Sequence, residues 1–118
     1  MEKIIRHSKD GSEGAILTIE EGNIMVAFEN CCEGYCGDYD PDNPEDEELI
    51  RFTVWANYGE DDWQEVDDAS YCTTIPVNSP WKVLEKKIKT IFREYKELEN
   101  HILSGGSVKK LGETLSWI

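Results

Sequence analysis

The chain has 118 residues, and its 25 acidic and 12 basic side chains give a formal net charge of −13. This excess of acid excludes a protein that binds the nucleic-acid backbone directly, because such proteins neutralise phosphates with clustered Lys and Arg. The share of Leu, Ile, Val and Phe lies above the floor of about 20% below which highly charged chains stay disordered. We therefore expect one folded domain over residues 1–118, with a single modest core.

The first half of the chain predicts an antiparallel sheet. Two apolar, β-branched runs at 15–19 and 24–28 flank a Glu-Glu-Gly-Asn turn signal, which is typical of a β-hairpin. Residues 30–48 are rich in Gly, Pro, Asn and Asp, so we expect a long loop there. Apolar and polar residues alternate from Leu49 to Tyr58, which is the clearest strand pattern. After a turn at 59–62, a fourth strand is predicted over 63–75, with a bulge at Asp67–Asp68.

Two helices are predicted from residue 79 onward. Ser79 is the expected N-cap and Pro80 the first helical residue. Apolar residues then recur at spacings of three and four over about six turns, until Gly105–Gly106 ends the helix. A shorter helix is expected over 107–118, with Ser107 as its cap. The apolar stripe of the long helix consists of Trp81, Leu84, Ile88, Ile91, Tyr95, Leu98 and Ile102.

Strands followed by helices indicate an α+β fold. We expect an antiparallel sheet of about four strands in residues 1–78, with one face covered by one long helix, and a short terminal helix after it, in the helical residues 79–118. No stretch approaches the ~18 consecutive apolar residues that a membrane helix needs. The N-terminal residues also lack the apolar segment of a signal peptide. A cytoplasmic protein without membrane contact is the expectation.

The acidic residues are concentrated in one part of the sequence. Between Glu29 and Asp68 there are 15 acidic residues against a single base, Arg51. If the sheet brings the long loop and the 59–62 turn to one side, their carboxylates form a strongly negative surface, which could occupy a basic groove built for phosphates. The alternative is that the acidic residues serve solubility only. The candidate partner-binding residues are Asp38, Asp40, Asp42, Glu45, Asp46, Glu47, Glu48, Glu60, Asp61 and Asp62, with Tyr35, Tyr39, Tyr58 and Trp63 as candidate aromatic anchors.

Metal binding is a second hypothesis. Asp38, Asp40 and Asp42 match the first oxygen positions of a calcium-binding loop, but Asn43 and Leu49 replace the Gly and Glu that such a loop requires. Four cysteines in a reducing compartment are expected to be thiols or metal ligands before disulfides. The candidate structural zinc ligands are Cys31, Cys32, Cys36 and Cys72, with His7 or Asp38 as alternatives for one position; otherwise Cys72 is a small core residue and the loop thiols are free.

Signals for catalysis are absent from the sequence. No nucleophile motif surrounds any cysteine, and no Gly-rich phosphate-binding pattern occurs. The acidic residues lie in predicted loops without the apolar surroundings that would raise a carboxyl pKa for acid catalysis. His101 falls near the end of the long helix, where a surface or capping role is expected. We therefore expect a protein that is not an enzyme.

Two segments carry a resemblance to known proteins. GDYDPDNPEDEELIRF (37–52) and VDDASYCTTIP (66–76) resemble small acidic proteins carried by phages and mobile elements of Gram-positive bacteria. Some proteins of that kind are anti-CRISPR inhibitors that bind the RNA-guided nuclease of type II systems, often in the channel meant for DNA. The resemblance implies a non-enzymatic inhibitor whose partner is a basic nucleic-acid-binding groove.

Two alternatives stay open. One is a small zinc-stabilised structural or adaptor domain of a mobile element, with acidity that serves solubility only. The other is that Trp81, Trp117 and the lysines of the long helix face a partner or a second copy of the chain; these lysines are Lys82, Lys86, Lys87 and Lys89.

Overall fold

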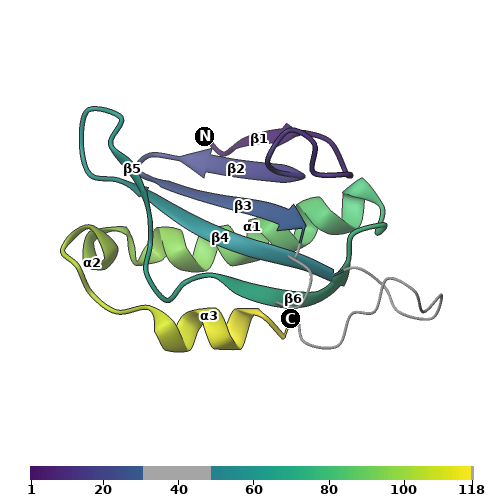
Figure 1. Cartoon of the computed structure of the whole chain (residues 1–118). Helices are drawn as coiled ribbons and strands as arrows, with labels where there is room; N and C mark the ends of the chain where they lie inside the picture. The colour runs from purple at the N-terminus through teal and green to yellow at the C-terminus, as the bar shows by residue number, and fades with distance from the viewer. Residues whose placement is uncertain (31–48, 118) are drawn as a thin grey trace.

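The computed structural model describes residues 1–30 and 49–117, which form an α+β structure with one antiparallel sheet (Figure 1). Strands β1 to β5 lie side by side in chain order, and β6 also pairs with β4. The α+β class is as predicted, but the sheet has six strands where about four were expected. The strands are β1 (Lys3–Arg6), β2 (Leu17–Glu21), β3 (Ile24–Asn30), β4 (Leu49–Asn57), β5 (Trp63–Glu65) and β6 (Tyr71–Pro76).

Two differences explain the extra strands. The predicted strand over 63–75 is divided into β5 and β6, which pair with opposite ends of β4. The expected bulge at Asp67–Asp68 is therefore a break between strands, and a register shift occurs instead between Leu49 and Arg51 of β4. Strand β1 was not predicted, because four residues that are mostly exposed carry too short an alternation to recognise.

The core lies between one face of the sheet and the helices. Strand side chains alternate between the two faces, so Val26 and Phe28 of β3 share a face with Val54 and Phe52 of β4, their partners in register. All four are fully buried. Helix α1 (Trp81–Glu97) runs across this face of the sheet (Figure 1). Five of its side chains, from the predicted stripe and its flank, are buried: Leu84, Ile88, Ile91, Phe92 and Tyr95.

The helical region departs from the predicted boundaries. The apolar stripe predicted one helix through Ile102, but the chain leaves helical geometry at Leu98 (φ −99°, ψ 15°), and a separate helix α2 (Glu99–Leu103) follows. Pro80, without a side-chain cap hydrogen bond, is the N-cap of α1 in place of Ser79. Helix α3 (Lys109–Leu115) confirms the short terminal helix, but its N-cap is Val108 and not Ser107. None of the described helices is long and apolar enough to span a membrane.

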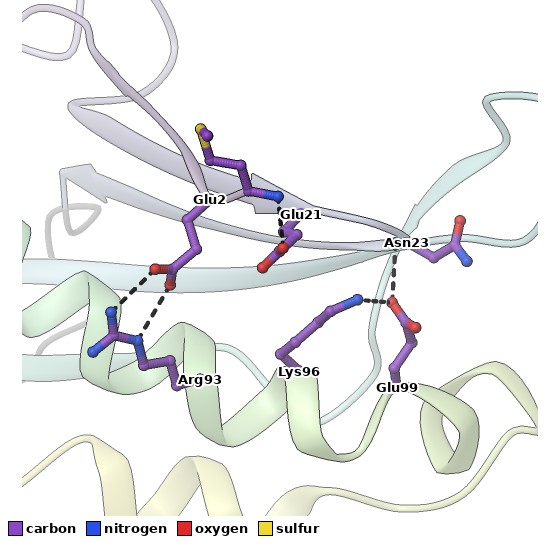
Figure 2. A network of polar contacts seen from close by, with 7 residues as sticks. Glu2, Glu21, Asn23, Arg93, Lys96 and Glu99 are labelled. Atoms are coloured by element: carbon purple, nitrogen blue, oxygen red, sulfur yellow. Dashed lines mark hydrogen bonds and ion pairs between the residues drawn. The ribbon is translucent and has the colours of Figure 1, made fainter.

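Polar contacts attach the helices to the first strands (Figure 2). Lys96 Nζ donates to Glu99 Oε2 at 2.6 Å, and the backbone N–H of Asn23 in the β2–β3 turn donates to the same oxygen at 3.0 Å. The hydrogen bond from Lys96 is the main cause that lowers the pKa of the Glu99 carboxyl. Arg93 pairs with Glu2 at 3.1 Å in the same region. These contacts fasten the end of α1 and the start of α2 to the β2–β3 turn and to the residue before β1.

Candidate binding surface at one end of the sheet

The turn between β4 and β5 projects from one end of the sheet (Figure 1). The N–H of Asp62 donates to the carbonyl of Gly59, and the N–H of Tyr58 donates to the carbonyl of Asp62, both at 3.0 Å. The two central residues, Glu60 (φ 53°) and Asp61 (φ 62°), are in the left-handed region. Asn-Gly is the pair that adopts such a turn most readily. Acidic side chains thus occupy positions where local backbone preference favours other residues.

A second acidic stretch, Asp67–Asp68, lies in the connection from β5 to β6. Asp68 has a φ of 60°, and among the described residues the three non-glycine residues with positive φ are Glu60, Asp61 and Asp68. Left-handed backbone at non-glycine residues carries a conformational cost and concentrates at functional sites. We call the six exposed carboxylates of this region the acidic end; they belong to Glu60, Asp61, Asp62, Glu65, Asp67 and Asp68.

Five of the six carboxylates at the acidic end have no neutralising base. Only Glu65 lies within ion-pair distance of a described base, with 3.8 Å between Arg51 Nη2 and its Oε1. Residues 31–48 contain no Lys, Arg or His that could supply one. The other ion pairs among described residues lie elsewhere. They are Glu2 with Arg93, Glu21 with the N-terminal amine, Glu85 with Arg6, and Glu99 with Lys96. The acidic end therefore projects uncompensated negative charge into solvent.

A cavity of about 220 Å³ adjoins the acidic end. Tyr58, Asp67 and Asp68 line it together with the Gly105–Gly106 connection between α2 and α3. Val66 and Ile102, both buried, supply its apolar lining. Tyr58 is 44% exposed and belongs both to the turn and to the cavity. The cavity thus joins the two acidic stretches through an aromatic side chain.

The candidate partner-binding residues have different outcomes. Glu60, Asp61 and Asp62 lie exposed in the turn at the end of β4. Asn30 and Leu49, which flank residues 31–48, lie at the other end of their strands (Figure 1). Seven candidates lie outside the described residues, as do Tyr35 and Tyr39, and their role stays a prediction. These seven are Asp38, Asp40, Asp42, Glu45, Asp46, Glu47 and Glu48.

Sequence reasoning missed the contribution of Asp67 and Asp68. The sequence pattern predicts only a bulge at this pair, because the two acidic residues interrupt the strand pattern. Their proximity to Tyr58 and to Gly105–Gly106 depends on how the β5–β6 and α2–α3 connections come together, which no local pattern shows. The sequence gives one signal for Asp67 and Asp68: two adjacent acidic residues interrupt a predicted strand.

The metal hypothesis receives no support from the described residues. Cys72 is disulfide-bonded, contrary to the expectation of a thiol or metal ligand, so its sulfur is not a zinc-binding thiolate in this state. Within 1–30 and 49–117, no three His, Cys, Asp or Glu side chains form a group that could hold a metal. The ring of His7 instead contacts Thr18 Oγ1 at 3.1 Å. Cys31, Cys32, Cys36 and Asp38 lie outside the described residues, so a zinc site there stays a prediction.

Two further titratable side chains, Glu29 and His101, have structural partners. Glu29 of β3 is half-buried on the sheet face away from α1, and burial raises the pKa of its carboxyl. Thr53 Oγ1 donates to Glu29 at 3.3 Å and accepts from Trp55 Nε1 at 3.0 Å, so the group is part of a cross-strand polar ladder. His101 is exposed in α2, and its Nε2 lies 2.9 Å from the carbonyl of Ser107 in the α2–α3 connection, which is not one of the carbonyls at the end of α2.

Comparison with known proteins adds no relative: no protein-family model, curated protein or solved structure matches the chain. The function proposed below rests on the acidic end and its cavity.

Proposed function

We propose that this protein is a non-enzymatic inhibitor that binds the basic groove of a nucleic-acid-processing enzyme. The observation that carries the proposal is the acidic end, where five exposed carboxylates have no neutralising base. A groove that binds a phosphate backbone presents Lys and Arg, and clustered carboxylates offer those side chains a matching pattern of charge.

The local backbone supports this interpretation over simple solubility. Solubility requires only that acidic side chains are exposed, and any exposed position satisfies that need. At the acidic end, Glu60, Asp61 and Asp68 adopt the left-handed region, which Asp tolerates but which costs Glu free energy of the order of 1 kcal/mol. Charges held in this way on a short hydrogen-bonded turn have a defined spacing, which is useful for recognition.

The specific target that we propose is a type II CRISPR nuclease bound to its guide RNA. The resemblance of residues 37–52 and 66–76 to small acidic phage and mobile-element proteins favours this target. Such a nuclease holds its heteroduplex in a positively charged channel and stabilises a displaced DNA strand by backbone contacts. A strongly acidic protein that occupies the channel would block access of DNA.

Charge removal at the β4–β5 turn tests the proposal. The triple variant Glu60→Gln, Asp61→Asn, Asp62→Asn should bind the nuclease–guide complex at least about tenfold more weakly than the unaltered protein, because the lost attraction of three interface charges exceeds about 1.4 kcal/mol. Binding is measured by titration at two salt concentrations, together with inhibition of DNA cleavage. Affinity should fall as salt rises, since exposed charges are screened.

A second triple variant controls for net charge. Glu13→Gln, Glu94→Gln, Glu113→Gln removes the same charge from exposed positions outside the acidic end, and we expect its affinity to change by less than about twofold. Equal loss in both variants would show that binding depends on net charge alone. If the unaltered protein forms no complex with the nuclease, this target is wrong.

A further inference from the structure

The cavity beside the acidic end has the size of one side chain. Its volume of about 220 Å³ is below the range of roughly 300–1,000 Å³ that small-molecule and cofactor sites occupy. It lies where the end of β4, the β5–β6 connection and the α2–α3 connection meet, at the end of the molecule that also carries the β4–β5 turn (Figure 1). An occupant would therefore be a single group, presented by a partner that contacts the acidic end.

The lining of the cavity selects the chemistry of that group. Val66 and Ile102 provide apolar contact for a methylene chain. Tyr58, which is 44% exposed, is the aromatic residue of the lining. Asp67 and Asp68 provide two carboxylates that form no ion pair with any described base. A long apolar stem with a cationic head satisfies all three features at once.

Arginine fits this combination better than lysine. Its planar guanidinium has five donors, which can bind two carboxylates, and it stacks on aromatic rings. The ammonium of lysine is a compact, strongly hydrated charge that does not stack in this way. A neighbouring cavity of about 240 Å³ shares Tyr58 with the first, but no acidic residue lines it. The two aspartates therefore distinguish the first cavity as the cation site.

We propose that the cavity lined by Tyr58, Asp67 and Asp68 is a pocket for an arginine side chain of the partner protein. The proposal rests on the proposed function, because it names the contact by which a basic groove would be recognised. Arginine is common in such grooves, where it contacts phosphates and bases. One buried arginine would fix the position of the protein, and the exposed turn would add attraction at longer range.

The test uses N-acetyl-arginine amide as the probe and the complete protein. Titration followed by amide NMR should produce saturable shifts at residues 58, 66–68 and 105–107. N-acetyl-lysine amide should bind at least about threefold more weakly, because its ammonium cannot bind two carboxylates in a plane. Shifts that centre on residues 60–62, or equal affinity for the two probes, would overturn the proposal.

Matched variants separate the pocket from general charge. Asp67→Asn, Asp68→Asn should weaken binding of the arginine probe at least about fivefold. The variant is compatible with the fold at position 68, because Asn tolerates left-handed backbone. Glu13→Gln, Glu94→Gln removes the same charge from exposed positions outside the acidic end and should change binding by less than about twofold. Equal losses would overturn the proposal. If the aspartate variant does not fold, Tyr58→Leu supplies the test, because it removes the aromatic ring and should weaken the arginine probe more than the lysine probe.

The arginine pocket can be tested separately from the proposed nuclease target. If the arginine probe binds the pocket but the protein forms no complex with the nuclease–guide complex, the target is wrong and the pocket stands. If the nuclease binds and Asp67→Asn, Asp68→Asn leaves its affinity unchanged, the pocket is wrong and the acidic surface stands.

Discussion

Tyr95 of α1 is a buried tyrosine whose hydroxyl has no hydrogen-bond partner among the described residues. Burial raises the pKa of the phenol, which therefore stays neutral at ordinary pH. The ring lies 6.4 Å from that of Phe52 in the core, so the side chain contributes apolar contact. A buried hydroxyl without a partner loses its hydrogen bonds to water on folding, at a cost of about 1–3 kcal/mol.

Replacement of this hydroxyl should stabilise the protein. We expect Tyr95→Phe to raise the free energy of unfolding by about 1 kcal/mol, because the ring contacts remain and an unsatisfied polar atom is removed. Urea denaturation of both proteins measures the change. A decrease in stability would mean that the hydroxyl has a hydrogen-bond partner, such as a buried water.

At the scale of elements, Gly112 decides how α3 packs on the sheet. Glycine disfavours a helix interior, but α3 forms around Gly112, which is buried. A Cβ atom at this position would lie 2.3 Å from Cε2 of Tyr71 and 3.1 Å from Oη of Tyr95. The tyrosine of β6 can therefore approach the helix backbone only because the residue has no side chain.

Gly112→Ala should destabilise the attachment of α3. Alanine favours helix over glycine by up to about 1 kcal/mol, but displacement of a packed aromatic ring costs about 1–3 kcal/mol. We expect a net loss of stability, with the largest amide NMR shifts in residues 107–117. Glu113→Ala, at an exposed position of the same helix, should be close to neutral. A stabilised Gly112→Ala protein would show that Tyr71 moves aside without cost.

For the molecule as a whole, charge opposes folding. The net charge is −13, and the ion pairs found among the described residues are few and largely at the surface, where each contributes about 0–1 kcal/mol. Repulsion among the remaining carboxylates should therefore exceed the attraction within these pairs.

Added salt should raise the stability of the protein. Screening shortens the range of repulsion from about 30 Å at 0.01 M salt to about 8 Å at 0.15 M. We expect the melting temperature to increase with sodium chloride over this range. Glu60→Gln, Asp61→Asn should be more stable than the unaltered protein at low salt, and the difference should shrink as salt is added. A melting temperature that falls with salt would show that ion pairs dominate.

Local patterns in the sequence were sufficient for much of the fold. Alternation identified β4, the Glu-Glu-Gly-Asn signal identified the β2–β3 hairpin, and spacings of three and four identified the buried face of α1. These features are set by residues that are close together in the sequence, so the sequence alone is enough to predict them. Boundaries were predicted less well, because the break at Leu98 and the division of β5 from β6 arise where distant segments meet.

The sequence by itself determined the α+β class, the long helix and the concentration of acidic residues between Glu29 and Asp68. Only the tertiary structure decided which carboxylates remain without a base and which side chains surround a cavity. Tyr58, Asp67 and Gly105 are distant in sequence, and the path of the chain through β5, β6 and the helices brings them together. Long-range packing sets that path, because burial rewards the contact of apolar faces wherever they occur in the chain.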